Sequence, residues 1–301
     1  MKSSKYSLKV IRNRVRNLAQ LSTLPHIAAR VVDLVDNPKT SAATVGRVIS
    51  TDQVLAARIL KLANSAYYGF PREISTLNLA IVVLGFNALR DLVMSISVID
   101  QFTVDDEGTF EANQFWRHAL VVGMGARLLS RYKGYSVAGE VFVAGLLHDI
   151  GYLVMYQQFP ELFREVYYQA KTGGVPFYQA EQQKLEFTHA DLGAWLAEAW
   201  NLPDKLVDAI RYHHHPDNSE HSHSGLTQLI HIANMISYSI DEGSGLNHFE
   251  NLEETLDEQL KTVVSRSYSL EFFQKKILDE SEKIDDFLHI LTSKKPATEL
   301  V

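Results

Sequence analysis

Residues 141–152 read VFVAGLLHDIGY, an apolar run that ends in a histidine and an aspartate. An uninterrupted run of this kind is typical of a helix that is buried on all sides. His148 and Asp149 follow the run directly, so both side chains are expected in the protein interior. A buried charge without a partner costs several kcal/mol, so the pair must be hydrogen-bonded, ion-paired or bound to a metal. Taken alone, the dipeptide is better explained by a core histidine held by its neighbour than by a metal site.

Other histidines lie at predicted helix ends or on apolar helix faces. His118 lies in FWRHALVVGMGARLL, and His189 follows Thr188, a residue suited to capping a helix. His213 and His214 end a helix in IRYHHHP, where the helix dipole also favours histidine. Each has an ordinary structural explanation, but helix bundles build metal sites from facing helices in this way. The joint pattern therefore predicts one shared site, whose expected ligands are His118, His148, Asp149, His189, His213 and His214.

The chemistry of these side chains limits the metal. Imidazole-rich sites with one carboxylate favour Fe, Zn, Mn or Ni over Mg or Ca, which prefer oxygen ligands. One or two ions are expected. Asp149 is the expected bridging and catalytic residue, because a carboxylate has two oxygens and an imidazole only one free nitrogen. His215, His221 and His223 are expected to lie outside the site.

Apolar residues recur at helical spacing through most of the chain, which predicts an all-α protein with more than about two-thirds helix and no sheet. Ser41 and Asp52 are predicted to cap helices, and a long apolar helix is predicted from Ser75 or Thr76 to about Ile99. That helix is too apolar for any side to be expected to face water. Further helices are predicted at about 114–132, 137–158, 160–172, 176–184, 189–200, 203–214 and 225–240, with two more in 249–292.

Composition excludes several classes of protein. The net charge is −7 and the chain has no cysteine, so disulfides and thiol catalysis are excluded and a broad nucleic-acid surface is not expected. The N-terminus has no apolar segment of the kind found in secretory signals. The longest apolar runs, around 79–86 and 119–126, are shorter than the roughly 18 residues of a membrane span. We therefore expect a cytoplasmic protein that binds neither nucleic acid nor membranes.

The order of these motifs resembles a known family. His118, then His148 and Asp149 in LLHDIG, then His189 and the pair His213-His214 follow the ligand order of HD-domain metal-dependent phosphohydrolases, in particular the HD-GYP pattern. The segments LPHIAARVVDLVDNP (24–38), ISTDQVLAARILKLANSAYYG (49–69) and THADLGAWLAEAWNLPDKLVDAIRYHHHP (188–216) resemble the HDOD domain, the HD-related output domain of bacterial signalling proteins.

The resemblance, which covers about residues 20–240, implies an N-terminal helical subdomain, placed at 8–105, and an HD-like helical core with the metal site, placed at 110–240. The helical pattern of 249–292 adds a C-terminal helical extension. The acidic segment 103–113 is the expected boundary between the first two. The resemblance also implies a bacterial regulatory role, and family members commonly lack a demonstrated enzymatic activity.

Two positions depart from the catalytic pattern. Catalytic HD proteins close the site with a late aspartate where this chain has Asn234, and the HD-GYP lysine that meets phosphate is replaced by Tyr152. The GYP signature is also missing. We expect Asn234 and Tyr152 to serve at most as a weak metal ligand or a substrate contact. Two functions stay open: a signalling module that acts through signalling proteins or a nucleotide ligand, which we favour, and a metal-dependent phosphohydrolase acting on a nucleotide or cyclic dinucleotide.

Overall fold

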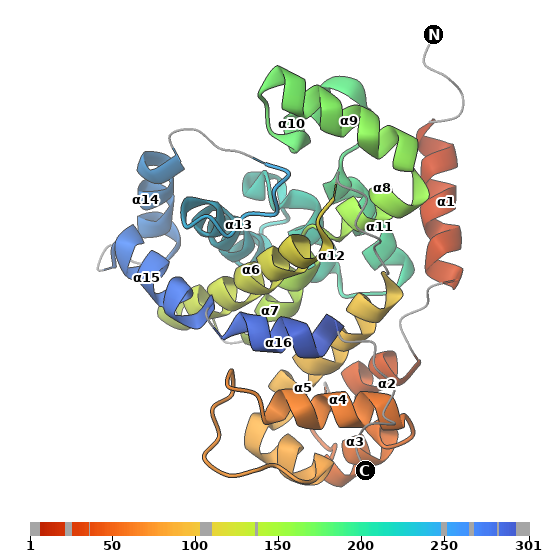
Figure 1. Cartoon of the computed structure of the whole chain (residues 1–301), viewed down its shortest axis with the longest axis vertical. Coiled ribbons are helices and arrows are strands. Elements are labelled where there is room, and N and C mark those ends of the chain that lie inside the picture. The colour runs from red at the N-terminus through yellow and green to blue at the C-terminus, as the bar shows by residue number, and fades with distance from the viewer. Residues whose placement is uncertain are drawn as a thin grey trace. The chain divides into compact units, whose positions relative to one another are not determined.

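Helices dominate the described part of the chain (Figure 1). The computed structural model describes residues 7–21, 26–35, 37–102, 110–135, 138–247, 252–264, 268–281 and 283–292. Helix accounts for 76% of the described residues, and no strand occurs among them. The all-α prediction is therefore confirmed.

The chain divides into two compact units. The larger comprises Met1–Ser22 and Val104–Leu278, and the smaller comprises Thr23–Thr103 and Asp279–Val301. This division differs from the expected boundaries, because the first helix belongs to the larger unit and the last helix to the smaller. Most of the acidic segment expected at the boundary, residues 103–109, lies outside the described residues.

The helices of the smaller unit are α2 (His26–Val35), α3 (Ala42–Ile49), α4 (Gln53–Ala63), α5 (Leu77–Gln101) and α16 (Ile284–Thr292). Those of the larger unit are α1 (Leu8–Leu21), α6 (Ala112–Lys133), α7 (Ala138–Leu147), α8 (Ile150–Gln158), α9 (Pro160–Gly173), α10 (Phe177–Lys184), α11 (His189–Ala199), α12 (Asp204–Tyr212), the short 3-10 helix η2 (Pro216–Asn218), α13 (Ser224–Ser239), α14 (Leu252–Val263) and most of α15 (Leu270–Ser281). The segment expected to form two terminal helices thus forms three.

Helix starts in the smaller unit follow the local sequence. Ser41, Asp52 and Thr76 each accept a hydrogen bond from the backbone N–H three residues later, at 3.2, 3.0 and 3.2 Å. These bonds satisfy N–H groups that have no partner within the helix. The caps predicted at Ser41 and Asp52 are therefore present, and Thr76 rather than Ser75 caps α5.

The long apolar helix α5 differs from its prediction. Gly85 has φ 80° and ψ 165°, a conformation open to glycine, and it breaks the helix into two parts. Before the break, Leu79, Val82 and Val83 are 41%, 71% and 40% exposed. The expectation that no side of this helix faces water is wrong for this first part. After the break, nearly every residue from Leu89 to Ile99 is buried.

Helix α5 is also the one helix among the described residues that is long and apolar enough to cross a membrane by length and composition. The search for long uninterrupted apolar runs in the sequence did not detect this helix. Arg90 and Asp91 interrupt the run, whereas the hydropathy averaged over 18 residues stays apolar. A buried core helix passes the same test, and 56% of this stretch is buried inside the protein. The finding is weak evidence for a membrane span.

A turn at His148-Asp149 separates α7 from α8, where one helix from 137 to 158 was predicted. The prediction was wrong because both helices are largely buried, so their apolar residues show no change of face at the break. Asp149 precedes α8 with φ −101° and ψ 10°, and its side chain makes no capping bond. The carboxylate is therefore free to serve another contact.

Glycines let the helices around this turn approach closely. A Cβ atom on Gly145 of α7 would lie 2.5 Å from Cα of Gly123 on α6. A Cβ atom on Gly151 of α8 would lie 1.8 Å from the carbonyl oxygen of His189. Gly193 of α11 in turn packs against the backbone of Gly151. Only glycine fits at such contacts. They hold the His148-Asp149 turn against α6 and α11.

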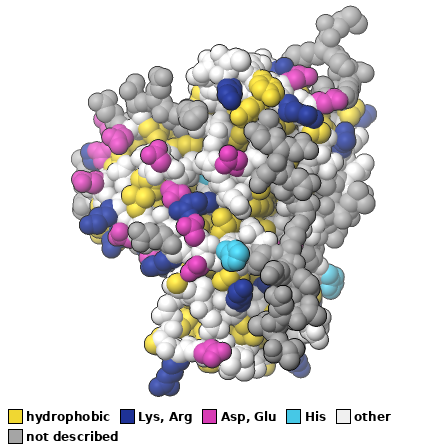
Figure 2. All heavy atoms as spheres, viewed as in Figure 1, with side chains coloured by type: hydrophobic (Ala, Val, Ile, Leu, Met, Phe, Trp, Pro, Cys, Tyr) yellow, Lys and Arg dark blue, Asp and Glu magenta, His cyan; other side chains and the backbone are white. Residues whose placement is uncertain are grey.

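Figure 2 shows one face of the protein, on which acidic and basic side chains are interspersed over the described residues. No single basic stripe crosses the described part of that face. The mixed charge agrees with the chain's 29 basic and 36 acidic residues.

Candidate metal centre

Four segments of the larger unit carry the histidines predicted from sequence. Helix α6 carries His118, the α7–α8 turn carries His148 and Asp149, α11 begins with His189, and His213 and His214 follow α12. The α11 start is fixed by Thr188 and Asp191, which form a reciprocal capping box. His118, His148, Asp149, His189 and His213 are each at most 1% exposed, and His214 is partly buried.

The two oxygens of Asp149 face different histidines. Oδ2 lies 3.6 Å from Nε2 of His118 and 3.3 Å from Nε2 of His148. Oδ1 lies 3.2 Å from Nε2 of His189 and 3.3 Å from Nε2 of His213. The carboxylate therefore lies between two groups of imidazoles.

His214 completes the second group, with its Nε2 lying 3.1 Å from Nε2 of His189. Within each group the potential ligand atoms all lie within 4.8 Å of one another, a spacing that could hold an ion. The first group is His118, His148 and Asp149; the second is Asp149, His189, His213 and His214. The structure thus brings all six predicted side chains together and gives Asp149 to both groups.

The other ring nitrogen, Nδ1, is held by an acceptor in four of the rings. His118 donates to the carbonyl of Glu242 at 2.9 Å, His148 to that of Gly145 at 2.7 Å and His213 to that of Ile210 at 2.7 Å. His189 donates to a carboxylate oxygen at 2.6 Å. A carbonyl accepts only from a protonated nitrogen, so in the neutral rings the Nε2 lone pair is left facing the cluster. Metal-bound histidines are oriented in this way.

Several buried atoms of the cluster lack a hydrogen bond. Both oxygens of Asp149, Nε2 of His118 and Nε2 of His148 have no hydrogen-bond partner among the described residues, and neither does Oδ1 of the buried Asn234 on α13. Although the Nε2 atoms come within 3.6 Å of Asp149, their directions do not suit hydrogen bonds. Buried polar atoms are nearly always paired, and such a group is accounted for by an ion. The donor set therefore fits a divalent transition metal.

The charges in the centre are unevenly distributed. Burial alone would raise the pKa of Asp149, but the surrounding imidazoles, His148 foremost, hold it well below its usual range. Burial lowers the pKa of His213 to about 4 and that of His214 well below its usual range. Burial also disfavours the charged form of His189, but the carboxylates of Glu181 and Asp149 outweigh it and raise its pKa to about 9. Without an ion, the two carboxylates therefore favour the protonated form of His189, whereas burial favours the neutral forms of His213 and His214.

One functional residue was missed in the sequence. Glu181 of α10 is completely buried, and its two oxygens accept from the backbone N–H and from Nδ1 of His189 at 2.8 and 2.6 Å. The available signal was a glutamate on the same helix face as Phe177 and Ala180, which are both buried. A glutamate inside an apolar stripe requires a buried partner.

Tyr152 and Asn234 are both in the interior. The Tyr152 ring stacks on His189, with centroids 3.8 Å apart, and its hydroxyl accepts from Nδ2 of Asn247 at 3.1 Å. Burial, with Asp149 and Glu181 nearby, raises the pKa of Tyr152 well above its usual value, so it stays neutral. Asn234 on α13 is 2% exposed. Neither belongs to the two ligand groups.

The remaining histidines named above lie apart from the two ligand groups. His215 contacts the ring of Tyr178, and His221 is exposed. His223 pairs with Asp208 at 2.7 Å in a more exposed group with Glu220. His231, whose position was not predicted, donates from Nδ1 to the backbone carbonyl of His213 at 2.7 Å and so supports a cluster residue.

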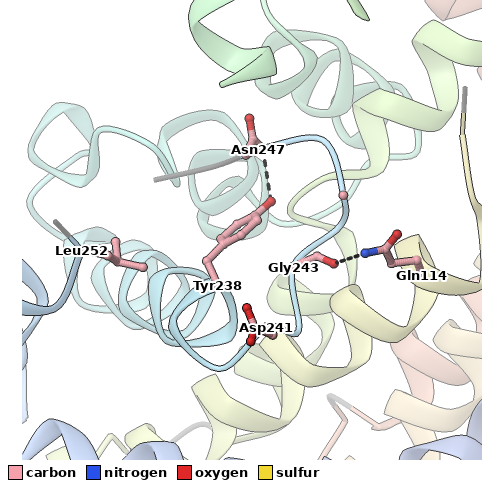
Figure 3. A pocket seen from close by; sticks show the side chains of 7 residues that line it. Gln114, Tyr238, Asp241, Gly243, Asn247 and Leu252 are labelled. Atoms are coloured by element: carbon pink, nitrogen blue, oxygen red, sulfur yellow. Dashed lines mark hydrogen bonds between the residues drawn. The ribbon is translucent and has the colours of Figure 1, made fainter. Parts of the chain in front are cut away.

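A pocket of about 280 Å³ lies beside this cluster (Figure 3). Tyr238 forms part of its wall and contacts the ring of His118, with centroids 5.1 Å apart. Asn247, at another wall, donates to the hydroxyl groups of Tyr238 and Tyr152 at 3.2 and 3.1 Å. The remaining lining residues are Gln114, Asp241, Gly243, Gly245 and Leu252. The pocket is thus one aromatic ring away from the cluster.

An all-helical fold with a buried cluster of five histidines and a shared aspartate defines an HD-type helical protein. The family model of the HDOD domain matches residues 21–216. The chain belongs to the HDOD family, as its motifs indicated.

Solved structures agree with this assignment. An HDOD domain protein with unknown function from Geobacter sulfurreducens is similar with a TM-score of 0.75 and 23% identity, covering 94% of this chain and 98% of that one. A candidate phosphohydrolase from Shewanella amazonensis is similar with a TM-score of 0.73 and 26% identity, covering 92% and 97%. An uncharacterized protein of Treponema pallidum is 24% identical over 256 residues; the match spans 81% of this chain but only 49% of that protein.

Proposed function

We propose that this chain is a bacterial regulatory module in which the His/Asp cluster holds one or two divalent ions of Fe, Zn, Mn or Ni. The observation that supports it is the set of four Nε2 atoms that lie within 3.6 Å of the Asp149 oxygens, which have no hydrogen-bond partner among the described residues. The module acts in the cytoplasm through contacts with a signalling protein or a nucleotide, not with nucleic acid or a membrane.

The second candidate is a metal-dependent phosphohydrolase with Asp149 as its catalytic residue. It is supported by the similarity to the Shewanella candidate phosphohydrolase at 26% identity. When bound, a divalent ion lowers the pKa of a coordinated water toward about 7 and makes it a nucleophile at neutral pH. Against this candidate, Tyr152 replaces the phosphate-binding lysine of HD-GYP proteins with a buried neutral ring, and Asn234 replaces a carboxylate.

The two functions are separated by one experiment. Elemental analysis of the purified protein identifies the metal, and the protein loaded with it is assayed against cyclic nucleotides and cyclic dinucleotides. We expect bound metal with absent or very slow turnover. Robust hydrolysis that His148→Ala abolishes would contradict the regulatory proposal in favour of the second candidate.

Asn234→Asp is expected to raise metal affinity by roughly tenfold, or about 1.4 kcal/mol. The resemblance places position 234 where catalytic HD proteins have a ligating aspartate, and Ser237, one turn later on α13, contacts Nδ1 of His118 at 3.2 Å. The substitution is therefore expected to add a charged oxygen close to the first ligand group. Without metal, the new buried carboxylate should lower the free energy of unfolding.

Calorimetric metal titration measures the affinity, and Asn218→Asp, which adds the same charge at an exposed position, is the control. Equal affinities for Asn234→Asp and the unaltered protein would show that Asn234 is not beside the ions.

A further inference from the structure

We propose that Glu181 is a positioning residue that selects which ring nitrogen of His189 faces the cluster. The proposal extends the proposed metal site, because it assigns a role to a residue that is not itself a ligand. It rests on the geometry of one buried carboxylate and one ring.

Both oxygens of Glu181 are committed to the same residue. Oε1 accepts from the backbone N–H of His189 at 2.8 Å, and Oε2 accepts from its Nδ1 at 2.6 Å. The backbone bond lies at the first residue of α11, where the N–H has no partner within the helix. Glu181 therefore anchors the helix start and the ring together, and the ring cannot turn without breaking one of two short bonds.

This arrangement fixes a proton on Nδ1. An ionised carboxylate only accepts hydrogen bonds, so the nitrogen that faces it must carry the proton. Nε2 is then the nitrogen left for the cluster, where it lies 3.2 Å from Asp149 and 3.1 Å from Nε2 of His214. An ion held at Nε2 would leave the Glu181 bond to Nδ1 in place.

His189 differs from the other rings of the cluster in this respect. Nδ1 of His118, His148 and His213 is held by neutral backbone carbonyls, whereas Nδ1 of His189 is held by a carboxylate. A carboxylate makes the ring a stronger electron donor to a metal than a carbonyl does. Stacking on Tyr152, with ring planes inclined by 20°, further restricts the ring.

Glutamine at position 181 has nearly the same shape but reverses the pattern. Its amide oxygen must accept the backbone N–H of His189, because the opposite orientation would place two donors against each other. The amide nitrogen then faces Nδ1 and donates to it. The proton must then sit on Nε2. An ion taking its place there would force a proton back onto Nδ1, against the donating amide, so metal binding should be weaker.

The test uses the full-length protein with ¹⁵N-labelled histidine. In the metal-free unaltered protein we expect Nδ1 of His189 to show the shift of a protonated nitrogen, and in Glu181→Gln that of an unprotonated one. Zinc titration should show affinity lowered by roughly 10- to 100-fold in Glu181→Gln. Glu165→Gln is the matched control, because Glu165 also contacts α10, through Lys184 at 3.0 Å, but is exposed.

An unprotonated Nδ1 in the unaltered protein would overturn the proposal, and so would zinc affinity of Glu181→Gln equal to that of the control. If Glu181→Gln does not fold, the spectrum of the unaltered protein still tests whether Nδ1 of His189 carries the proton. A protein that binds no zinc but shows the predicted Nδ1 proton would contradict the metal site and leave the role of Glu181 in orienting His189 intact.

Discussion

Asp149→Asn is expected to abolish metal binding, with an affinity loss of more than about 1,000-fold, or about 4 kcal/mol. Asp149 is the only side chain that belongs to both ligand groups, and its carboxylate is the only negative charge in either. Asparagine keeps the shape of the side chain but supplies one neutral oxygen and an amide that cannot ligate. Both ions should therefore be lost together.

The measurement is metal content after dialysis, together with the rise in melting temperature that metal causes by binding the folded state. We expect neither bound metal nor a rise in melting temperature for Asp149→Asn. Asp33→Asn is the control, because Asp33 is exposed on α2 and belongs to neither ligand group. Stoichiometric metal retained by Asp149→Asn would show that the ions bind elsewhere.

Gly151→Ala is expected to reduce the free energy of unfolding by about 3 kcal/mol or more, at the upper end of overpacking effects. The added Cβ would lie 1.8 Å from the His189 carbonyl oxygen and 2.8 Å from the backbone nitrogen of Gly193. These are backbone atoms, so α8 and α11 must move apart. His189 moves with α11, and metal affinity should fall as well.

Urea unfolding of the metal-free protein measures this loss. Gly173→Ala is the matched control, because a Cβ there meets only Val175 at 3.7 Å and alanine favours the helix. A Gly151→Ala stability within about 1 kcal/mol of the control would mean that the close approach of α8 and α11 does not constrain the fold.

Local chemistry made much of the fold predictable. Ser41, Asp52 and Thr188 cap helices through bonds that span three residues, so their role is visible in a short stretch of sequence. The break at the His148-Asp149 turn was hidden, because helices buried on several sides show no amphipathic phase that a break could interrupt. The break at Gly85 was hidden in the same way, within an apolar sequence whose exposed face carries valine and leucine.

The side chains that form the cluster could be predicted from the sequence, but the residues that hold them in place could not. The six side chains stand out as histidines and one aspartate at helix ends or, for His118, on an apolar helix face, and their order matches a known family. Glu181 is supplied by a helix that has no histidine, and its role depends on a contact across eight residues with His189. The pattern of apolar and polar residues along one helix does not reveal a contact between side chains of two different helices. The sharing of Asp149 between two groups depends on the direction of its two oxygens, which only the structure supplies.

The most direct measurement is anomalous diffraction at the absorption edge of the metal found in the purified protein. The account predicts one or two anomalous peaks beside the Asp149 carboxylate, within bonding distance of Nε2 atoms from His118 and His148, from His189, His213 and His214, or from both groups. Metal-saturated crystals with no anomalous density beside Asp149 would contradict it.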